Sequence, residues 1–167
     1  PLPGEGTKES PAVRARLQSL GYLSGSVPRK AKYSEEDDPK KLIDVDRLMM
    51  QGIEFYQAGR AAQAQEAYRQ VIARRPDMGL AYRRLAFIQW EAGAPKEAIA
   101  TLRGALDRNG PDVDIEVRLG NYLAETGALP EAVAILERVV KTDSENIDAL
   151  NALGIAHARG GRSAEAI

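Results

Sequence analysis

Apolar residues recur along this chain at the three- and four-residue steps of an amphipathic helix, and the whole pattern repeats with a constant period of about 34 residues. Tyr82, Leu85 and Ile88, for example, follow one another at the helical spacing. The pattern predicts seven helices, over residues 44–58, 61–74, 79–92, 95–108, 113–126, 130–142 and 147–159. It also predicts the start of an eighth helix near Ser163.

Small residues mark the period of the repeat. Four glycines and four alanines each recur at this same constant step: Gly59, Gly93, Gly127 and Gly161, then Ala64, Ala98, Ala132 and Ala166. The glycines fall where the first helix of each pair should end, and glycine adopts the left-handed conformation of a helix end at little cost. Pro95 and Pro130 then fall in the first turn of a second helix, where a missing N–H costs little. The spacing indicates stacked helical hairpins rather than an enzyme core.

From about Asp44 onward the chain resembles the tetratricopeptide repeat family, whose first helix carries an aromatic residue, Leu-Gly and a second aromatic residue. The matching residues are Gly52, Phe55, Tyr68 and Pro76 in the first copy, Tyr82, Leu85 and Ala86 in the second, Leu119, Gly120 and Leu123 in the third, and Leu153, Gly154 and His157 in the fourth. The resemblance implies an all-α helical-hairpin solenoid over residues 44–167. Its repeats would lie at about 45–78, 79–112 and 113–146, with a truncated fourth at 147–167.

Composition narrows the functions to consider. The chain has 167 residues, a formal net charge of −1 and no cysteine. This charge offers no electrostatic case for nucleic acid, and no run approaches the ~18 apolar residues of a membrane span. The one histidine, His157, has no evident second ligand, so we expect it to pack between helices. We expect neither a cofactor nor a metal.

The first forty residues differ from the repeats. Residues 1–10 have the Pro, Gly and charge content of a flexible lead. A Ser-Pro start, an apolar face and a glycine stop predict a short helix over residues 11–23. Residues 24–43 have linker composition, and Asp38-Pro39 can start a helix that lengthens the first helix of the repeats.

Residues 11–40 also resemble the C-terminal end of bacterial sulfatase-family hydrolases that carry a tetratricopeptide tail. The short helix ending in Leu-Gly-Tyr at Tyr22 and the order of the domains carry this resemblance. It implies an exported or periplasmic parent enzyme that hydrolyses sulfate or phosphate esters. We expect this chain, which starts at Pro1 and stops within a helix, to be part of a longer protein. No Cys/Ser-x-Pro-x-Arg motif occurs in it, so we expect no catalysis from the chain itself.

In the tetratricopeptide family the first helices line a concave binding surface. The resemblance places these candidate partner-binding residues on it or beside it: Tyr56, Phe87, Trp90, Arg83, Arg84, Arg118, Asn121 and Asn151. The aromatic residues would anchor a partner, while arginine and asparagine would hold a peptide main chain or a carboxylate. Met49 and Ile53 stand where chaperone-binding members carry Lys and Asn, which argues against a chaperone tail as the ligand.

These observations predict a non-catalytic module that binds a protein or an extended peptide. Three alternatives remain open at this point. The aromatic residues could pack on each other or on the N-terminal helix; the chain could be the accessory tail of a hydrolase; or it could be a spacer without a ligand. The truncated fourth copy also predicts self-association through residues 147–167, because terminal repeats normally carry a polar outer face.

Overall fold

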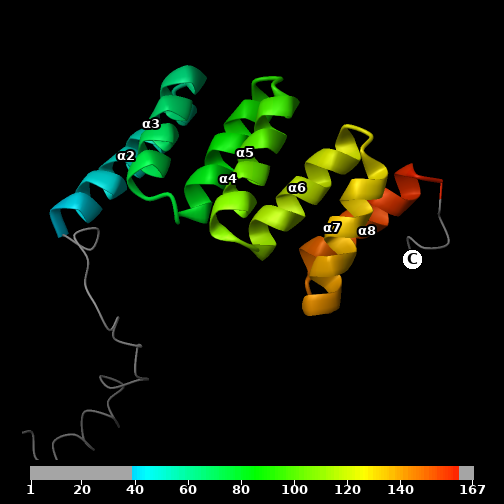
Figure 1. Cartoon of the computed structure of the whole chain (residues 1–167). Helices are drawn as coiled ribbons and strands as arrows, with labels where there is room; N and C mark the ends of the chain where they lie inside the picture. Colours follow the sequence, from blue (N-terminus) through cyan, green and yellow to red (C-terminus); the bar gives the residue numbers. More distant parts are fainter. Residues whose placement is uncertain (1–38, 162–167) are drawn as a thin grey trace, which may run out of the picture. The chain divides into compact units, whose positions relative to one another are not determined.

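The computed structural model describes residues 39–161, which form seven α-helices and no β-strand (Figure 1). The helices are α2 (Pro39–Gln57), α3 (Ala61–Arg74), α4 (Gly79–Glu91), α5 (Pro95–Asn109), α6 (Val113–Glu125), α7 (Leu129–Thr142) and α8 (Ile147–Arg159). They confirm the predicted all-α architecture, and α2 starts at Pro39 as the Asp-Pro pair predicts. The expected lead, the short helix over 11–23, most of the linker, the helix start near Ser163 and Ala166 lie outside the described residues.

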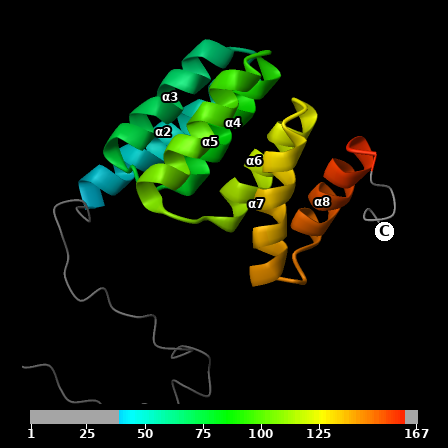
Figure 2. The ribbon, with the colours of Figure 1, turned by 45° about the vertical axis from the view of Figure 1, so that its right-hand side comes forward.

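Consecutive helices pair into hairpins, α2 with α3, α4 with α5 and α6 with α7. The first helices of successive hairpins also touch, since α4 contacts α6 and α6 contacts α8. Figure 2 shows α6 with the α4–α5 hairpin on one side and α8 on the other. The first helices α4, α6 and α8 therefore contribute side chains to a common surface.

A glycine with a positive φ angle follows two residues after the end of each first helix, as the repeat pattern predicts. The φ angles are 71° at Gly59, 75° at Gly93, 85° at Gly127 and 76° at Gly161. In the first three copies the residue after the glycine donates its backbone N–H to a carbonyl five residues earlier, at 2.8–2.9 Å. This bond satisfies a carbonyl that the helix end would otherwise leave unpaired.

Small residues let the two helices of a hairpin approach closely, as the repeat pattern predicts. Ala64, Ala98 and Ala132 are all 0% exposed. A Cβ atom on Gly120 would lie 2.6 Å from Cγ of Leu136, which is itself fully buried. Even one added methyl group therefore overlaps the second helix at this contact.

The buried carboxylate of Glu116 departs from the apolar pattern. Glu116 occupies the place that Tyr82 takes one repeat earlier and is 5% exposed. Its carboxylate accepts a hydrogen bond from Arg138 of α7 at 2.5 Å. The ion pair compensates for the buried charge, which would otherwise be costly to leave unpaired.

The close approach of α6 and α7 can be tested with two helical glycines. We expect Gly120→Ala to lower the free energy of unfolding by about 1–3 kcal/mol, because Leu136 has no free space to move into. We expect Gly104→Ala, at an exposed position of α5 with no atom near its added Cβ, to raise it by about 0.5–1 kcal/mol. Urea unfolding followed by circular dichroism measures both changes, and equal effects would contradict the packing argument.

The apolar face of α8 generates the second prediction. Leu150 is 43% exposed, whereas its counterparts Leu48 and Tyr82 are 8% and 6% exposed, and Ile147 is 70% exposed. We expect the chain to associate with itself through this face as its concentration rises, because an exposed apolar patch favours association. Sedimentation velocity over a concentration series measures this.

We expect Leu150→Glu to weaken the association, and the control Leu80→Glu, at a 41% exposed leucine of α4, to leave it unchanged. A monomer at every concentration would show that the apolar face of α8 does not mediate self-association.

Candidate functional site

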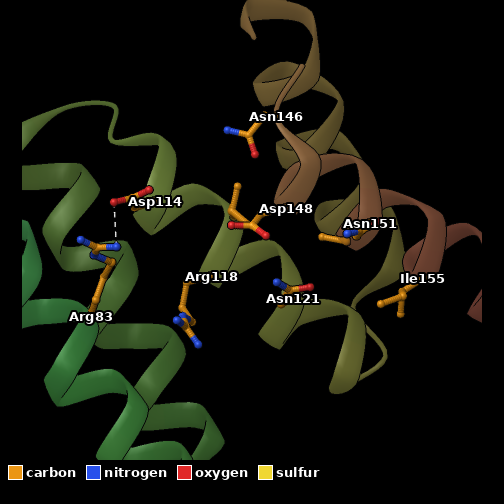
Figure 3. A pocket seen from close by; sticks show the side chains of 10 residues that line it. Arg83, Asp114, Arg118, Asn121, Asn146, Asp148, Asn151 and Ile155 are labelled. Atoms are coloured by element: carbon orange, nitrogen blue, oxygen red, sulfur yellow. Dashed lines mark ion pairs between the residues drawn. The ribbon is translucent and has the colours of Figure 1, made fainter. Parts of the chain in front are cut away.

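A polar groove of about 340 Å³ lies where α4, α6 and α8 meet (Figure 3). Helix α4 contributes one residue, and α6 and α8 contribute four each. One more precedes α8. The lining residues are Arg83, Asp114, Val117, Arg118, Asn121, Asn146, Asp148, Asn151, Ala152 and Ile155. Four of the candidate residues from the sequence are among them: Arg83, Arg118, Asn121 and Asn151.

Helical spacing explains why these side chains share one surface. Asp114, Arg118 and Asn121 follow at four- and three-residue steps on α6, and such steps place side chains on one face of a helix. Asp148 and Asn151 repeat this relation on α8. Asp148 lies one full repeat after Asp114, so both occupy the same place in successive copies.

An ion pair holds one wall of the polar groove. Nη1 of Arg83 lies 2.7 Å from a carboxylate oxygen of Asp114, which ties α4 to α6 (dashed line in Figure 3). Arg118 has no carboxylate partner within residues 39–161, and Asp148 is likewise outside the ion pairs of that region. The groove thus has balanced formal charge, with two arginines and two aspartates, but no ion pair joins Arg118 to Asp148.

Three asparagine side chains line the polar groove, and one of them has different surroundings from the other two. Asn146 is the N-cap of α8, and its side-chain oxygen accepts a hydrogen bond from the backbone N–H of Ala149 at 2.9 Å. Asn121 and Asn151 make no hydrogen bond to other residues of the described region. Each amide can therefore donate to and accept from a ligand.

A second cavity, the aromatic pocket, lies between α2 and α4 and has a volume of about 280 Å³. Its lining residues are Ile53, Tyr56, Gln57, Tyr68, Arg84, Phe87 and Ile88. The rings of Tyr56 and Phe87 meet edge to face with centroids 5.6 Å apart. Burial raises the pKa of Tyr68, and the nearby positive charge of Arg84 opposes this rise. The pocket therefore combines an apolar lining with one exposed cation.

Trp90 has a different partner from the other two candidate aromatic residues. Its ring stacks on Tyr122 of α6 with centroids 4.0 Å apart and planes 11° from parallel. Tyr122 is only 4% exposed, and Trp90 packs against the same hydrophobic core. The structure thus pairs Tyr56 with Phe87 and Trp90 with Tyr122, so Trp90 joins two repeats instead of lining the aromatic pocket.

Sequence reasoning missed three polar lining residues of the polar groove: Asp114, Asn146 and Asp148. The recurrence of an aspartate at one place in successive repeats was the available signal. His157 is buried at 5% exposure in α8, as expected of a packing residue. Across residues 39–161 no three His, Asp or Glu side chains gather into a potential metal site, and no helix there has the length and apolar character to cross a membrane.

A family model of the tetratricopeptide repeat matches residues 49–114 and 117–167. The chain belongs to the tetratricopeptide repeat family. No curated protein sequence gives a significant match. This family assignment confirms the resemblance over the repeats, whereas the resemblance of residues 11–40 to a hydrolase tail has no match among these comparisons.

Solved tetratricopeptide structures share the fold at low sequence identity. A tetratricopeptide repeat protein from Parabacteroides merdae has a TM-score of 0.64 and 18% identity over 74% of this chain, which spans 50% of that protein. The second such domain of human RPAP3, solved with an HSP70 peptide, has a TM-score of 0.60 and 22% identity over 69% of this chain and 96% of its own. The first repeat domain of Spaghetti (RPAP3), bound to an HSP90 peptide, has a TM-score of 0.60 and 20% identity, covering 71% and 94%.

The buried tyrosines generate a prediction about pH. Burial is the main cause that raises the pKa of Tyr122 and of Tyr68 in the folded chain. Above about pH 10, the ordinary tyrosine pKa, the unfolded chain ionises first, so stability is lost as the pH rises through the folded values. We expect Tyr68→Phe with Tyr122→Phe to flatten this decline, measured by urea unfolding between neutral and alkaline pH. If the free energy of unfolding of the double variant declines as steeply with pH, the two buried tyrosines are not the cause of the alkaline loss of stability.

Proposed function

We propose that this repeat module is non-catalytic and binds an extended segment of another protein in the polar groove. The observation that carries the proposal is the pair Asn121 and Asn151. They line one groove from successive first helices, and neither amide is used by the fold within the described residues. An amide side chain pairs naturally with a peptide main chain, which presents one donor and one acceptor at each residue.

The surroundings of the two amides favour a ligand of this shape. The groove is open across three helices, so an extended chain can cross them in turn. Arg83 is held by Asp114 before any ligand arrives. A prepositioned wall reduces the ordering that binding requires. Val117 and Ile155 add apolar contact beside the amides.

The solved structures support a peptide ligand by analogy only. The two RPAP3-type domains carry HSP70 and HSP90 peptides, so folds of this kind can accommodate a short peptide. In this chain Met49 and Ile53 replace the Lys and Asn expected for a chaperone tail. We therefore propose a different peptide as the ligand of the polar groove.

The alternative of an accessory tail concerns the parent protein rather than the groove. The Leu-Gly-Tyr segment and the order of domains favour a sulfatase-like enzyme upstream of this chain. A Cys/Ser-x-Pro-x-Arg motif encoded upstream of Pro1 would support it. Further repeats, or a start codon directly upstream, would contradict the accessory-tail alternative.

The binding proposal can be tested with a displayed library of random peptides selected on the full chain. We expect the selection to yield peptides whose affinity falls by about tenfold or more in the variant Asn121→Ala with Asn151→Ala, since each lost hydrogen bond contributes ~1 kcal/mol. Isothermal titration calorimetry measures the dissociation constants.

Gln63→Ala provides the matched control, because this exposed amide lies on α3, away from the residues that line the groove. It should leave the affinity unchanged. If the double variant binds every selected peptide as tightly as the original chain does, the groove is not the binding site.

A further inference from the structure

Two arginines recur at one position of successive repeats. Arg84 on α4 and Arg118 on α6 are separated by exactly one repeat, and both side chains are exposed. The first and fourth copies carry Met50 and Ala152 at the corresponding position. The repeat therefore places two cations on neighbouring first helices in the middle of the described region, and none at this position on either side.

These two arginines differ from others in the hairpins. Arg83, Arg103 and Arg138 each pair with a carboxylate of a neighbouring helix, at 2.7, 2.6 and 2.5 Å. Neither Arg84 nor Arg118 has such a partner within residues 39–161. A guanidinium group binds a carboxylate with two parallel hydrogen bonds, so each of these arginines can pair with a carboxylate of a ligand.

A buried tyrosine lies beside each of the two guanidinium groups. The positive charge of Arg84 partly offsets the burial that raises the pKa of Tyr68, and Arg118 does the same for Tyr122. Both arginines therefore lie close to rigid core side chains. A cation held near a fixed ring loses less freedom on binding than one on a mobile surface side chain.

The two cavities adjoin along α4. Arg83 lines the polar groove, while its neighbour Arg84 lines the aromatic pocket with Tyr56 and Phe87. Arg118 lies across the polar groove from Asn151 of α8, on the α6 side (Figure 3). One extended segment that crosses α4 can thus reach the apolar lining of one cavity and the amides of the other.

We infer that the segment bound by this module is acidic and carries a large apolar anchor. Its side-chain carboxylates pair with Arg84 and Arg118, and the apolar side chain fills the aromatic pocket. The inference rests on the proposed function and specifies its ligand. Adjacent first helices lie ~10 Å apart, so the carboxylates are about three residues apart in an extended chain.

The same features favour a protein over a nucleic acid. Only two uncompensated arginines of residues 39–161 face these cavities, Asp148 lies among the groove residues, and the chain carries a net charge of −1. A phosphate backbone needs a continuous basic track. Two separated cations beside an apolar pocket instead match a short pattern of acidic and apolar side chains.

The test uses fluorescein-labelled peptides of about 12 residues, spanning roughly 40 Å when extended. All have an amidated C-terminus and a Gly-Ser background. One set carries a phenylalanine and two glutamates at varied spacing, and the matched set carries glutamines instead. In anisotropy titrations we expect the best glutamate peptide to bind about tenfold more tightly than its glutamine counterpart.

Charge reversal then assigns the contacts. Arg84→Gln or Arg118→Gln should remove the preference for glutamate, and Arg118→Glu should restore binding to a peptide with lysine at the facing position. Arg108→Gln, at an exposed position of α5, is the control that should change nothing. Any of four results would overturn the inference. The glutamate and glutamine sets could bind equally, or neither set could bind. Both arginine variants could keep the full preference for glutamate, or a poly-U oligonucleotide could bind as tightly as the best peptide.

The outcomes separate the inference from the proposed function. If library-selected peptides bind through Asn121 and Asn151 but show no acidic preference, the acidic ligand is wrong and the groove remains a peptide site. If the double asparagine variant loses no affinity for any peptide, the proposed function itself fails.

Discussion

The close contact between a small residue of the first helix, glycine or alanine, and a large side chain of the second helix is the constraint on which the hairpins depend. An added Cβ atom would lie 2.7 Å from the ring of Tyr68 at Gly52, and 2.6 Å from Leu136 at Gly120. This contact commits one face of the first helix to its hairpin partner. The side chains of the opposite face consequently do not pack against the second helix. In α4, α6 and α8 some of them line the polar groove.

Contacts between first helices also hold the helices of this surface against one another. Trp90 stacks on Tyr122, and Arg83 pairs with Asp114, so an aromatic contact and an ion pair both join α4 to α6. On the second helices, Arg103 pairs with Glu131 across α5 and α7. Because these contacts fix α4 against α6 before a ligand arrives, they reduce the ordering that binding requires at this wall of the groove.

The hairpins could be predicted from the sequence because local physics determines them. A helical period and a glycine that ends the helix placed every described helix after α2 within one residue of its observed ends. The candidate binding site was harder to predict from the sequence. The repeat register brought Asn121 and Asn151 to one surface, but nothing in it distinguished Tyr122 from Phe87 as the partner of Trp90. Tertiary packing decided that choice, and Glu116 at an apolar position likewise depends on an arginine of the following helix.

The central claim is that ligands bind the face of the first helices that packing leaves free. Nuclear magnetic resonance of the ¹⁵N-labelled chain, titrated with a selected peptide, tests it most directly. The account predicts that the side-chain amide signals of Asn121 and Asn151 shift first, together with backbone signals of α4, α6 and α8. Shifts confined to the second helices α3, α5 and α7 would contradict it.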